Sequence, residues 1–307
     1  MIKIGIIGMS SGNAHPSSWS AIINGKFNSD EISKMGYPAV ADYLKANKDT
    51  LGLPGAYVTQ VWSQSRKISE QIQKTAEIGG IVGTLDEMIG KVDAVILSRD
   101  DAENHVKMAK PFIDAGIPLF IDKPLCASLK DLDYFKKEIA KGKFIMSCSS
   151  VRYSNECRSA KSGLKSLGKL KLVNAVGKKD WIKYGVHMLE AIFSLLDDPT
   201  PISVTNIGKD QHAIVHVEFE NGLQIIVNLV MDIAPTFQIS LFGQERWQII
   251  EIKNSYSMFR DNIIEFIRSV QEGKPRLNFS KTEQIIRVLI AAEESFKLNG
   301  KTINLLK

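Results

Sequence analysis

The first half of the chain alternates short apolar runs with segments of helical periodicity. The apolar runs fall at 2–7, 56–62, 92–97, 118–121 and 144–147. Helical patterns stand between them at about 65–75, 102–115 and 129–140. Short runs that are apolar throughout are typical of strands buried on both faces of a parallel sheet. Strand and helix in alternation therefore predict a doubly wound α/β domain with a parallel sheet.

The second half shows a different pattern, with many strands and few helices. Strands are predicted at 170–177, 202–207, 213–219, 223–230, 236–242 and 246–250. Helices are predicted at about 185–196, 258–271 and 282–298. A Glu220-Asn221-Gly222 turn joins two of the strands as a hairpin. This order predicts an α+β domain built on an open, mostly antiparallel sheet.

The predicted domain boundary lies near residue 122, between a dinucleotide-type domain at 1–122 and a second domain at 123–307. We expect the final helix to return and pack on the first domain. No strand fits between the first helix and residue 56, so segment 26–55 is predicted to be an insertion. It could cover an adenosine, line a substrate cleft or meet another subunit.

Composition excludes several classes of protein. Apolar residues make up 44% of the 307 residues and charged residues 24%, as in ordinary globular proteins. The net charge of +5 is spread along the chain and forms no basic stripe, which predicts no nucleic-acid partner. No apolar run approaches the ~20 residues of a membrane span, and the start has no signal-peptide cleavage pattern. Cys126, Cys148 and Cys157 lack metal-type spacing and fit reduced thiols in the cytoplasm.

A loop of small residues follows the first strand and precedes Pro16, which suits the first position of a helix. In doubly wound domains this is where backbone N–H groups at a helix N-terminus bind a dinucleotide pyrophosphate. The usual Gly-x-Gly-x-x-Gly spacing is broken here, so a glycine-rich turn without a ligand is the alternative. The candidate cofactor-binding residues of the loop are Gly8, Ser10, Ser11, Gly12 and Asn13.

The second strand ends at Ser63-Gln64-Ser65-Arg66, where a carboxylate would select a ribose diol. Serine and arginine suit a 2′-phosphate instead. Ser63 and Arg66 are therefore candidate cofactor-binding residues, and they slightly favour NADP over NAD. The alternative is that Arg66 only opens a solvated helix.

Asp122-Lys123-Pro124 follows the fourth strand, at the edge of the sheet where such domains bind ligands. The Lys123 ammonium could hydrogen-bond a reacting hydroxyl and assist proton transfer. An isolated Asp-Lys-Pro is otherwise a common turn.

Five motifs together resemble the Gfo/Idh/MocA family, relatives of glucose–fructose oxidoreductase and inositol dehydrogenase. They are Val92–Leu97 with Asn104-His105, Ala115–Pro124, Arg152-Tyr153, Tyr184–Glu190 with its Gly-x-His, and Phe266 through Glu272–Pro275 to Thr302. The segment ending in Asp122-Lys123-Pro124 is similar to the family's Glu-Lys-Pro signature, with Asp in place of Glu. The resemblance runs along nearly the whole chain.

The resemblance implies a Rossmann domain followed by an open-sheet domain through which members form dimers or tetramers. It implies hydride transfer between a nicotinamide and a hydroxyl-bearing carbon of a sugar or cyclitol. Lys123 would hold the reacting hydroxyl, and His187 would be the general acid/base, since its ordinary pKa lies near neutrality. His105 would pack beside the nicotinamide, and Asp122 and Lys123 would also be cofactor-binding residues. Arg152 would steer an anionic substrate or form a surface salt bridge.

The chain departs from the family at Lys183, because many members place Asp one helical turn before the histidine. Lys183 could bind a substrate carboxylate or phosphate, serve as the proton relay, or mark lost hydride chemistry. His15, in the phosphate loop, could face the cleft or only cap the helix. His212 and His216 share a strand face without nearby acids, and no metal is assigned.

The sequence thus predicts a cytoplasmic NAD(P)-dependent oxidoreductase that acts on a small-molecule hydroxyl, in a homodimer or homotetramer built through the second domain's sheet. Two alternatives remain open. The protein could be a catalytically inactive nucleotide-binding sensor or scaffold, or an enzyme that uses its cofactor as an internal redox relay.

Overall fold

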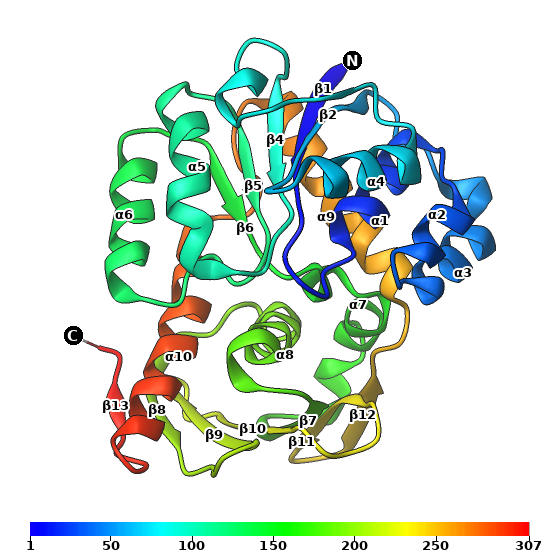
Figure 1. Cartoon of the computed structure of the whole chain (residues 1–307). Helices are drawn as coiled ribbons and strands as arrows, with labels where there is room; N and C mark the ends of the chain where they lie inside the picture. Colours follow the sequence, from blue (N-terminus) through cyan, green and yellow to red (C-terminus); the bar gives the residue numbers. More distant parts are fainter. Residues whose placement is uncertain (307) are drawn as a thin grey trace. The chain divides into compact units, whose positions relative to one another are not determined.

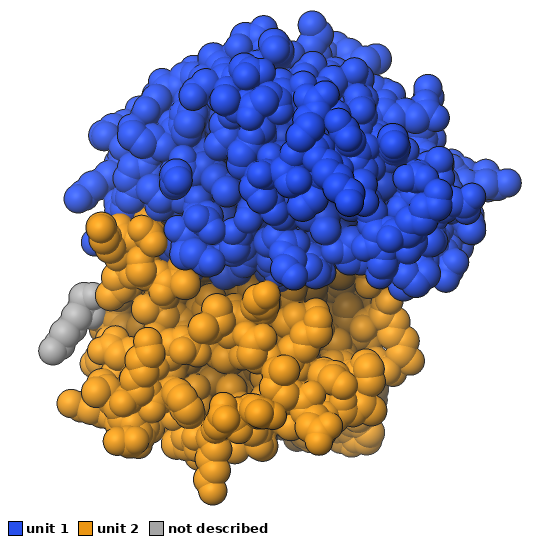
Figure 2. Space-filling model, in the orientation of Figure 1, with its two compact units in different colours: residues 1–126, 133–147, 259–278 blue, residues 127–132, 148–258, 279–307 orange. Residues whose placement is uncertain are grey.

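A parallel sheet forms the centre of the first of two units. The computed structural model describes residues 1–306, and its first unit comprises residues 1–126, 133–147 and 259–278 (Figure 2). The strands are β1 (Ile2–Ile7), β2 (Ala56–Trp62), β3 (Gly80–Ile81), β4 (Ala94–Leu97), β5 (Leu119–Ile121) and β6 (Ile145–Ser147). They lie in the order β3-β2-β1-β4-β5-β6, and every pair is parallel. This is the strand order of a Rossmann fold, with the topological switch beside β1.

Helices cover both faces of this sheet (Figure 1). One face carries α1 (His15–Asn24) and α4 (Arg66–Ala76), and the other carries α5 (His105–Asp114) and α6 (Leu129–Ala140). A late helix, α9 (Ser255–Glu272), joins the α1 face. Its Phe266 ring lies 5.6 Å from that of Phe120 on β5, and Trp19 of α1 packs on the same Phe120 at 5.8 Å. Because both faces are covered, β1 and β4 are almost wholly buried, as their apolar sequences predicted.

Segment 26–55, predicted as an insertion, is helical. It holds α2 (Ser29–Lys34), α3 (Pro38–Ala46) and a short 3₁₀ turn, η1 (Lys48–Thr50). Asn28 begins α2 by accepting two backbone N–H bonds at 3.1 Å, from Asp30 and Glu31. The helices α2 and α3 contact each other, α2 also contacts α4, and α3 also contacts α1. The insertion is thus a two-helix layer packed on this unit's own helices.

The second unit comprises residues 127–132, 148–258 and 279 onwards. Its strands are β7 (Leu170–Lys178), β8 (Pro201–Asn206), β9 (His212–Phe219), β10 (Gln224–Val230), β11 (Phe237–Gly243), β12 (Trp247–Glu251) and β13 (Ile303–Asn304). They lie in the order β12-β11-β7-β10-β9-β8-β13, and only β7 and β10 are parallel among the described pairs. The expected open, mostly antiparallel sheet is confirmed.

One face of this sheet is covered from within the unit. α8 (Trp181–Leu195) lies over β7 and β10, and α10 (Phe279–Lys297) packs on β8 and α8. The alternate side chains Val215, Val217 and Phe219 are at most 1% exposed. The Phe219 ring lies 5.4 Å from that of Phe193 on α8. A helix therefore buries the apolar stripe of β9. Two 3₁₀ turns, η4 (Ser150–Tyr153) and η5 (Leu164–Leu167), flank α7 (Asn155–Lys161) before β7.

Two details differ from the sequence predictions. α8 begins at Trp181 rather than 185, because the Asp180 carboxylate accepts the Lys183 backbone N–H at 2.9 Å and caps the helix. It is α9, rather than the final helix α10, that is grouped with the first unit, whose first segment ends at Cys126 rather than 122. Within residues 1–306, none of the helices combines the length and apolar character that crossing a membrane would require.

Candidate active site

The loop between β1 and α1 is shaped by its glycines. A Cβ on Gly8 would lie 2.3 Å from Cγ of Pro16, so only glycine fits where the strand meets the helix. Gly12 has φ +76°, and a Cβ there would meet nothing within 4 Å. Ser11 and Gly12 are exposed, and the N-cap residue of α1, Ala14, makes no side-chain cap hydrogen bond. An open, left-handed turn before a helix N-terminus fits a dinucleotide pyrophosphate.

Residues at the ends of the neighbouring strands hold this loop in place through hydrogen bonds. The Ser10 hydroxyl donates to Asp100, after β4, and accepts the Asp100 backbone N–H at 3.1 Å. The Met9 carbonyl accepts from the Gln64 amide at 2.9 Å and from Arg99 at 3.1 Å. Ser10 is thus engaged in holding the loop.

Arg99 is the central cation of this arrangement. It donates to Oε1 of Gln64 at 2.7 Å and forms a salt bridge with Asp101 at 2.6 Å. Burial alone would raise the pKa of Asp101, but hydrogen bonds from Arg99 and Asn104 outweigh it and hold that pKa below its ordinary value. The charged stretch Arg99-Asp100-Asp101 therefore supports the loop.

Asp122 connects the end of the loop to the end of β5. Its carboxylate lies 2.5 Å from Nδ1 of His15 and accepts from the Asn13 amide at 3.3 Å. Asn13 in turn accepts the His15 backbone N–H at 2.8 Å. Burial alone would raise the pKa of Asp122, but the charges of His15 and Lys123 hold it below its ordinary value. His15 also stacks on Trp19 at 4.4 Å, so it does more than begin the helix.

At the end of β2, the two residues predicted to contact the ribose end of the cofactor differ in their exposure to solvent. Ser63 is buried, and its hydroxyl donates to the Ser65 carbonyl at 2.7 Å and meets Ser69 at 2.9 Å. Arg66 is exposed at the start of α4 and pairs with Glu70 at 3.1 Å. Ser63 therefore shapes the turn, and Arg66 is the residue that presents charge to solvent.

Lys123 and His105 are both buried in the first unit. Lys123 is 5% exposed, and its backbone N–H donates to the Asp122 carboxylate at 2.8 Å. The two ring nitrogens of His105 lie 3.0 Å from the carbonyl oxygens of Leu125 and Arg99. His105 thus joins the loop after β4 to the segment after Pro124. This arrangement favours a structural role over the predicted contact with nicotinamide.

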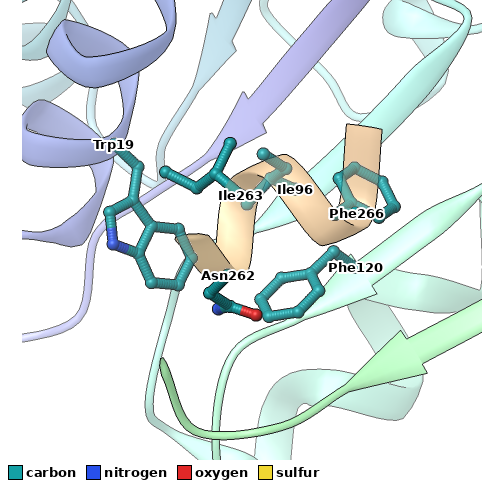
Figure 3. A pocket seen from close by; sticks show the side chains of 6 residues that line it. All are labelled: Trp19, Ile96, Phe120, Asn262, Ile263 and Phe266. Atoms are coloured by element: carbon teal, nitrogen blue, oxygen red, sulfur yellow. The ribbon is translucent and has the colours of Figure 1, made fainter. Parts of the chain in front are cut away.

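The first unit contains a narrow, largely apolar packing gap between α1, α9 and the sheet, too small to hold a water molecule (Figure 3). It is lined by Trp19, Ile96, Phe120, Asn262, Ile263 and Phe266. The aromatic and aliphatic side chains face one another across it, as in a hydrophobic core. It carries none of the predicted site residues.

In the second unit, α8 presents His187. Its Nδ1 lies 2.5 Å from the hydroxyl of Ser149, which stands just before η4. The Tyr184 ring packs edge-on at 5.1 Å, and the Tyr184 hydroxyl accepts from the Lys179 ammonium at 2.7 Å. His187 is half-buried, so its remaining face reaches solvent.

Lys183 and Asp180 occupy the preceding turn of α8. Lys183 is exposed, and the Asp180 carboxylate caps α8 by accepting the Lys183 backbone N–H. The position one turn before His187 thus carries an ammonium group at the surface.

Arg152 lies inside an ion-pair network of the second unit. Its guanidinium contacts Glu190 and forms a salt bridge with Asp198 at 2.7 Å, and Lys281 contacts Asp198 at 2.9 Å. The Arg152 side chain is only 6% exposed. Burial would lower the pKa of Arg152, but the two carboxylates raise it well above its ordinary value. This geometry matches neither the predicted substrate contact nor a surface salt bridge, since the charge is buried and paired.

The pKa values of the two carboxylates in this network shift in opposite directions. Burial raises the pKa of Glu190 despite the opposing effect of Arg152. Asp198 is also subject to burial, but Arg152 and Lys281 hold its pKa below its ordinary value.

Several contributors were missed by sequence reasoning: Gln64, Arg99, Ser149, Glu190 and Asp198. Glu190 stands one helical turn after His187, so its proximity was readable from helical spacing. The others meet their partners only through the tertiary fold.

Comparison with known proteins gives the same architecture. Residues 2–149 match the family model described as "Oxidoreductase family, NAD-binding Rossmann fold" (GFO_IDH_MocA). No curated protein matches the chain by sequence.

Solved structures match along the whole chain. Myo-inositol 2-dehydrogenase from Lactobacillus plantarum is 13% identical with a TM-score of 0.78, and 99% of each chain is covered. A myo-inositol dehydrogenase from Corynebacterium glutamicum is 13% identical with a TM-score of 0.77, and all of each chain is covered. Scyllo-inositol dehydrogenase from Lactobacillus casei with bound NAD(H) and scyllo-inositol is 13% identical with a TM-score of 0.77, and all of each chain is covered. At this identity the likeness establishes the fold alone. Residues 2–149 of the chain match the NAD-binding Rossmann domain of the Gfo/Idh/MocA oxidoreductase family.

Proposed function

We propose that this protein is a nicotinamide-dependent oxidoreductase that acts on a hydroxyl-bearing carbon of a cyclitol, sugar or sugar derivative. The observation that carries the proposal is the match of residues 2–149 to an NAD-binding oxidoreductase family. The structural neighbours support the substrate class, since several are inositol dehydrogenases. The open turn at Gly12, before the N-terminus of α1, is the part of the chain that would hold the pyrophosphate.

The proton chemistry is assigned to Lys123 and His187. A bound nicotinamide would take or supply the hydride at the reacting carbon. His187 is assigned the role of general acid/base for the hydroxyl proton, and the Lys123 ammonium that of hydrogen-bond donor to a reacting hydroxyl. Nδ1 of His187 faces Ser149, so Nε2 is the nitrogen assigned to the substrate.

We assign the cofactor contacts to the backbone of the loop from Gly8 to Asn13 and to the exposed Arg66. Arg66 supports NADP, because a guanidinium pairs well with a 2′-phosphate. Glu70, which pairs with Arg66, weakens that preference by placing a carboxylate nearby. NADP over NAD is therefore a slight preference.

Lys183 supports a substrate that carries an anionic group, since an exposed ammonium stands where relatives carry an acid. The same replacement also favours the second candidate, a nucleotide-binding sensor without turnover. The two functions differ in one observable: both bind a dinucleotide, and only the oxidoreductase changes its redox state.

The remaining assignments concern assembly and location. Three apolar side chains on one face of the β11–β12 hairpin are 40–66% exposed: Phe242, Trp247 and Ile249. Such a patch on an open sheet supports a homodimer or homotetramer. The three cysteines are free, which supports the cytoplasm as the protein's location.

The test is a turnover assay that follows NADH or NADPH formation with scyllo-inositol, myo-inositol and their phosphorylated or carboxylated analogues. The proposal predicts dinucleotide reduction with at least one of them, and loss of that reduction in His187→Gln. Dinucleotide binding without turnover on any would support the sensor.

A further inference from the structure

The geometry points to Ser149 as the positioning residue for His187, in place of the carboxylate that relatives carry on the helix itself. This inference rests on the proposed function, because it concerns the same proton-transfer step. The Ser149 Oγ lies 2.5 Å from Nδ1 of His187, and both residues belong to the second unit.

Ser149 is held in place independently of the histidine. The residue is fully buried at 0% exposure, and its backbone N–H donates to Oε1 of Glu190 at 3.1 Å. Glu190 lies one turn after His187 on α8, so a single helix face contacts both the hydroxyl and the amide of Ser149. Arg152 pairs with the other oxygen of Glu190. The serine is thus anchored to the helix that carries the histidine.

The Ser149 hydroxyl has the hydrogen-bonding capacity needed to orient the His187 ring. It already accepts the Val151 backbone N–H at 3.2 Å, which leaves one acceptor position and its own hydrogen. Toward Nδ1 it either donates its O–H or accepts the ring N–H. A carboxylate only accepts, and so it fixes the tautomer with the proton on Nδ1.

This difference matters for the proton transfer. When the hydroxyl of Ser149 accepts from Nδ1, the lone pair of Nε2 is available to take the substrate proton. After His187 has taken a proton, both ring nitrogens carry hydrogen, and Nδ1–H donates to Oγ without any further group having to ionise. In the reductive direction this imidazolium gives its Nε2 proton to the carbonyl oxygen and returns to the neutral form, with Nδ1–H still donating to Oγ. Ser149 therefore supports both directions of the reaction.

The charged residues around His187 favour a neutral hydrogen-bond partner for its imidazole. Lys183 stands one turn before His187, and the Glu190 carboxylate, one turn after it, contacts the amide of Ser149 and the guanidinium of Arg152. A hydroxyl orients the ring here without adding a charge between Lys183 and the buried pair of Glu190 and Arg152.

The test uses the full chain and three variants: Ser149→Ala, Ser149→Thr and Ser154→Ala. Ser154→Ala is the matched control, because Ser154 is equally buried and its hydroxyl likewise accepts a backbone N–H, that of Cys157. It has no contact with His187 among those described. The first readout is the ¹⁵N resonance of His187 Nδ1, assigned with His187→Gln and measured without cofactor or substrate. The second is kcat on the substrate found by the turnover assay.

We expect Ser149→Ala to move the Nδ1 resonance and to lower kcat about tenfold with little change in KM, the size of one lost hydrogen bond. Ser149→Thr is expected to restore both, and Ser154→Ala to leave both unchanged. An Nδ1 resonance that is the same in wild type and Ser149→Ala would overturn the inference. So would an equal fall in kcat in Ser154→Ala. If the wild type turns over no substrate, the proposed function fails, while the resonance still tests the contact.

Discussion

The imidazole of His15 and the carboxylate of Asp122 face each other at 2.5 Å, and this pair joins the loop before α1 to the end of β5. Asp122 has only 2% of its side chain exposed, whereas His15 has 17%. Two segments far apart in sequence are therefore fixed together at the place where a dinucleotide pyrophosphate would lie. The relation between them gives the protein's stability a pH dependence with a defined sign.

The pKa of Asp122 is lower in the folded protein than its ordinary value, so its ionised form stabilises the fold. That stabilisation is complete above the unfolded pKa of about 3.9 and is lost as the pH falls through the lower folded value. In His15→Gln the folded pKa of Asp122 is expected to rise, so less stability is lost on acidification. Urea unfolding at a series of pH values below neutrality measures this, with His212→Gln as the control, because His212 forms no ion pair with an acid among residues 1–306. Equal acid sensitivity in wild type and His15→Gln would contradict the expectation.

Lys123→Ala is expected to lower kcat by roughly 100-fold or more, because the variant lacks the ammonium that we propose to bind the reacting oxygen. The affinity for NADH should stay nearly unchanged. Steady-state kinetics and a fluorescence titration measure the two effects separately. Lys107→Ala, on the exposed side of α5, controls for the loss of one positive charge. Normal turnover in Lys123→Ala would remove this lysine from the mechanism.

Arg66→Ala should weaken the binding of NADPH about tenfold and that of NADH much less. The reason is that a charge-assisted hydrogen bond to the 2′-phosphate would be lost, whereas a ribose diol loses little. Lys67→Ala is the control, since Lys67 is a neighbouring exposed cation on α4. Equal losses for the two dinucleotides would mean that Arg66 does not contact the 2′-phosphate.

Gly12→Ala and Gly36→Ala form a matched pair. Both glycines have positive φ, +76° and +93°, and a Cβ on either would meet nothing within 4 Å. Each substitution is expected to cost about 1–2 kcal/mol of unfolding free energy through left-handed strain. Only Gly12→Ala should also weaken NADH binding, because its methyl group would stand where the pyrophosphate approaches the backbone. Denaturant unfolding measures the unfolding free energy of both variants, and titration with NADH measures their affinity for the dinucleotide. A similar affinity in both would argue against pyrophosphate binding at Gly12.

Much of the fold could be predicted from the sequence, because its signals are local. The fully apolar run of β1, the glycine after it and the strand-helix alternation define a parallel sheet within a short stretch of chain. The start of α8 was missed although its signal is also local, since Asp180 stands at an N-cap position.

The site was less predictable, because its contacts join residues far apart in the chain. Arg152 was expected to face substrate or solvent, yet its partners lie in α8 and in the segment after it. Likewise, Ser149 has no sequence feature that marks it as a partner of His187. Long-range pairing of this kind depends on how α8 packs beside η4, and one sequence does not encode that in any local pattern.

The most direct test of the account is a titration of the purified protein with NADH and with NADPH, following nicotinamide fluorescence. The account predicts saturable binding of at least one of them, weakened by Gly12→Ala and unaffected by Gly36→Ala. No binding of either dinucleotide would contradict it, because the loop from Gly8 to Asn13 would then be a structural turn without a ligand.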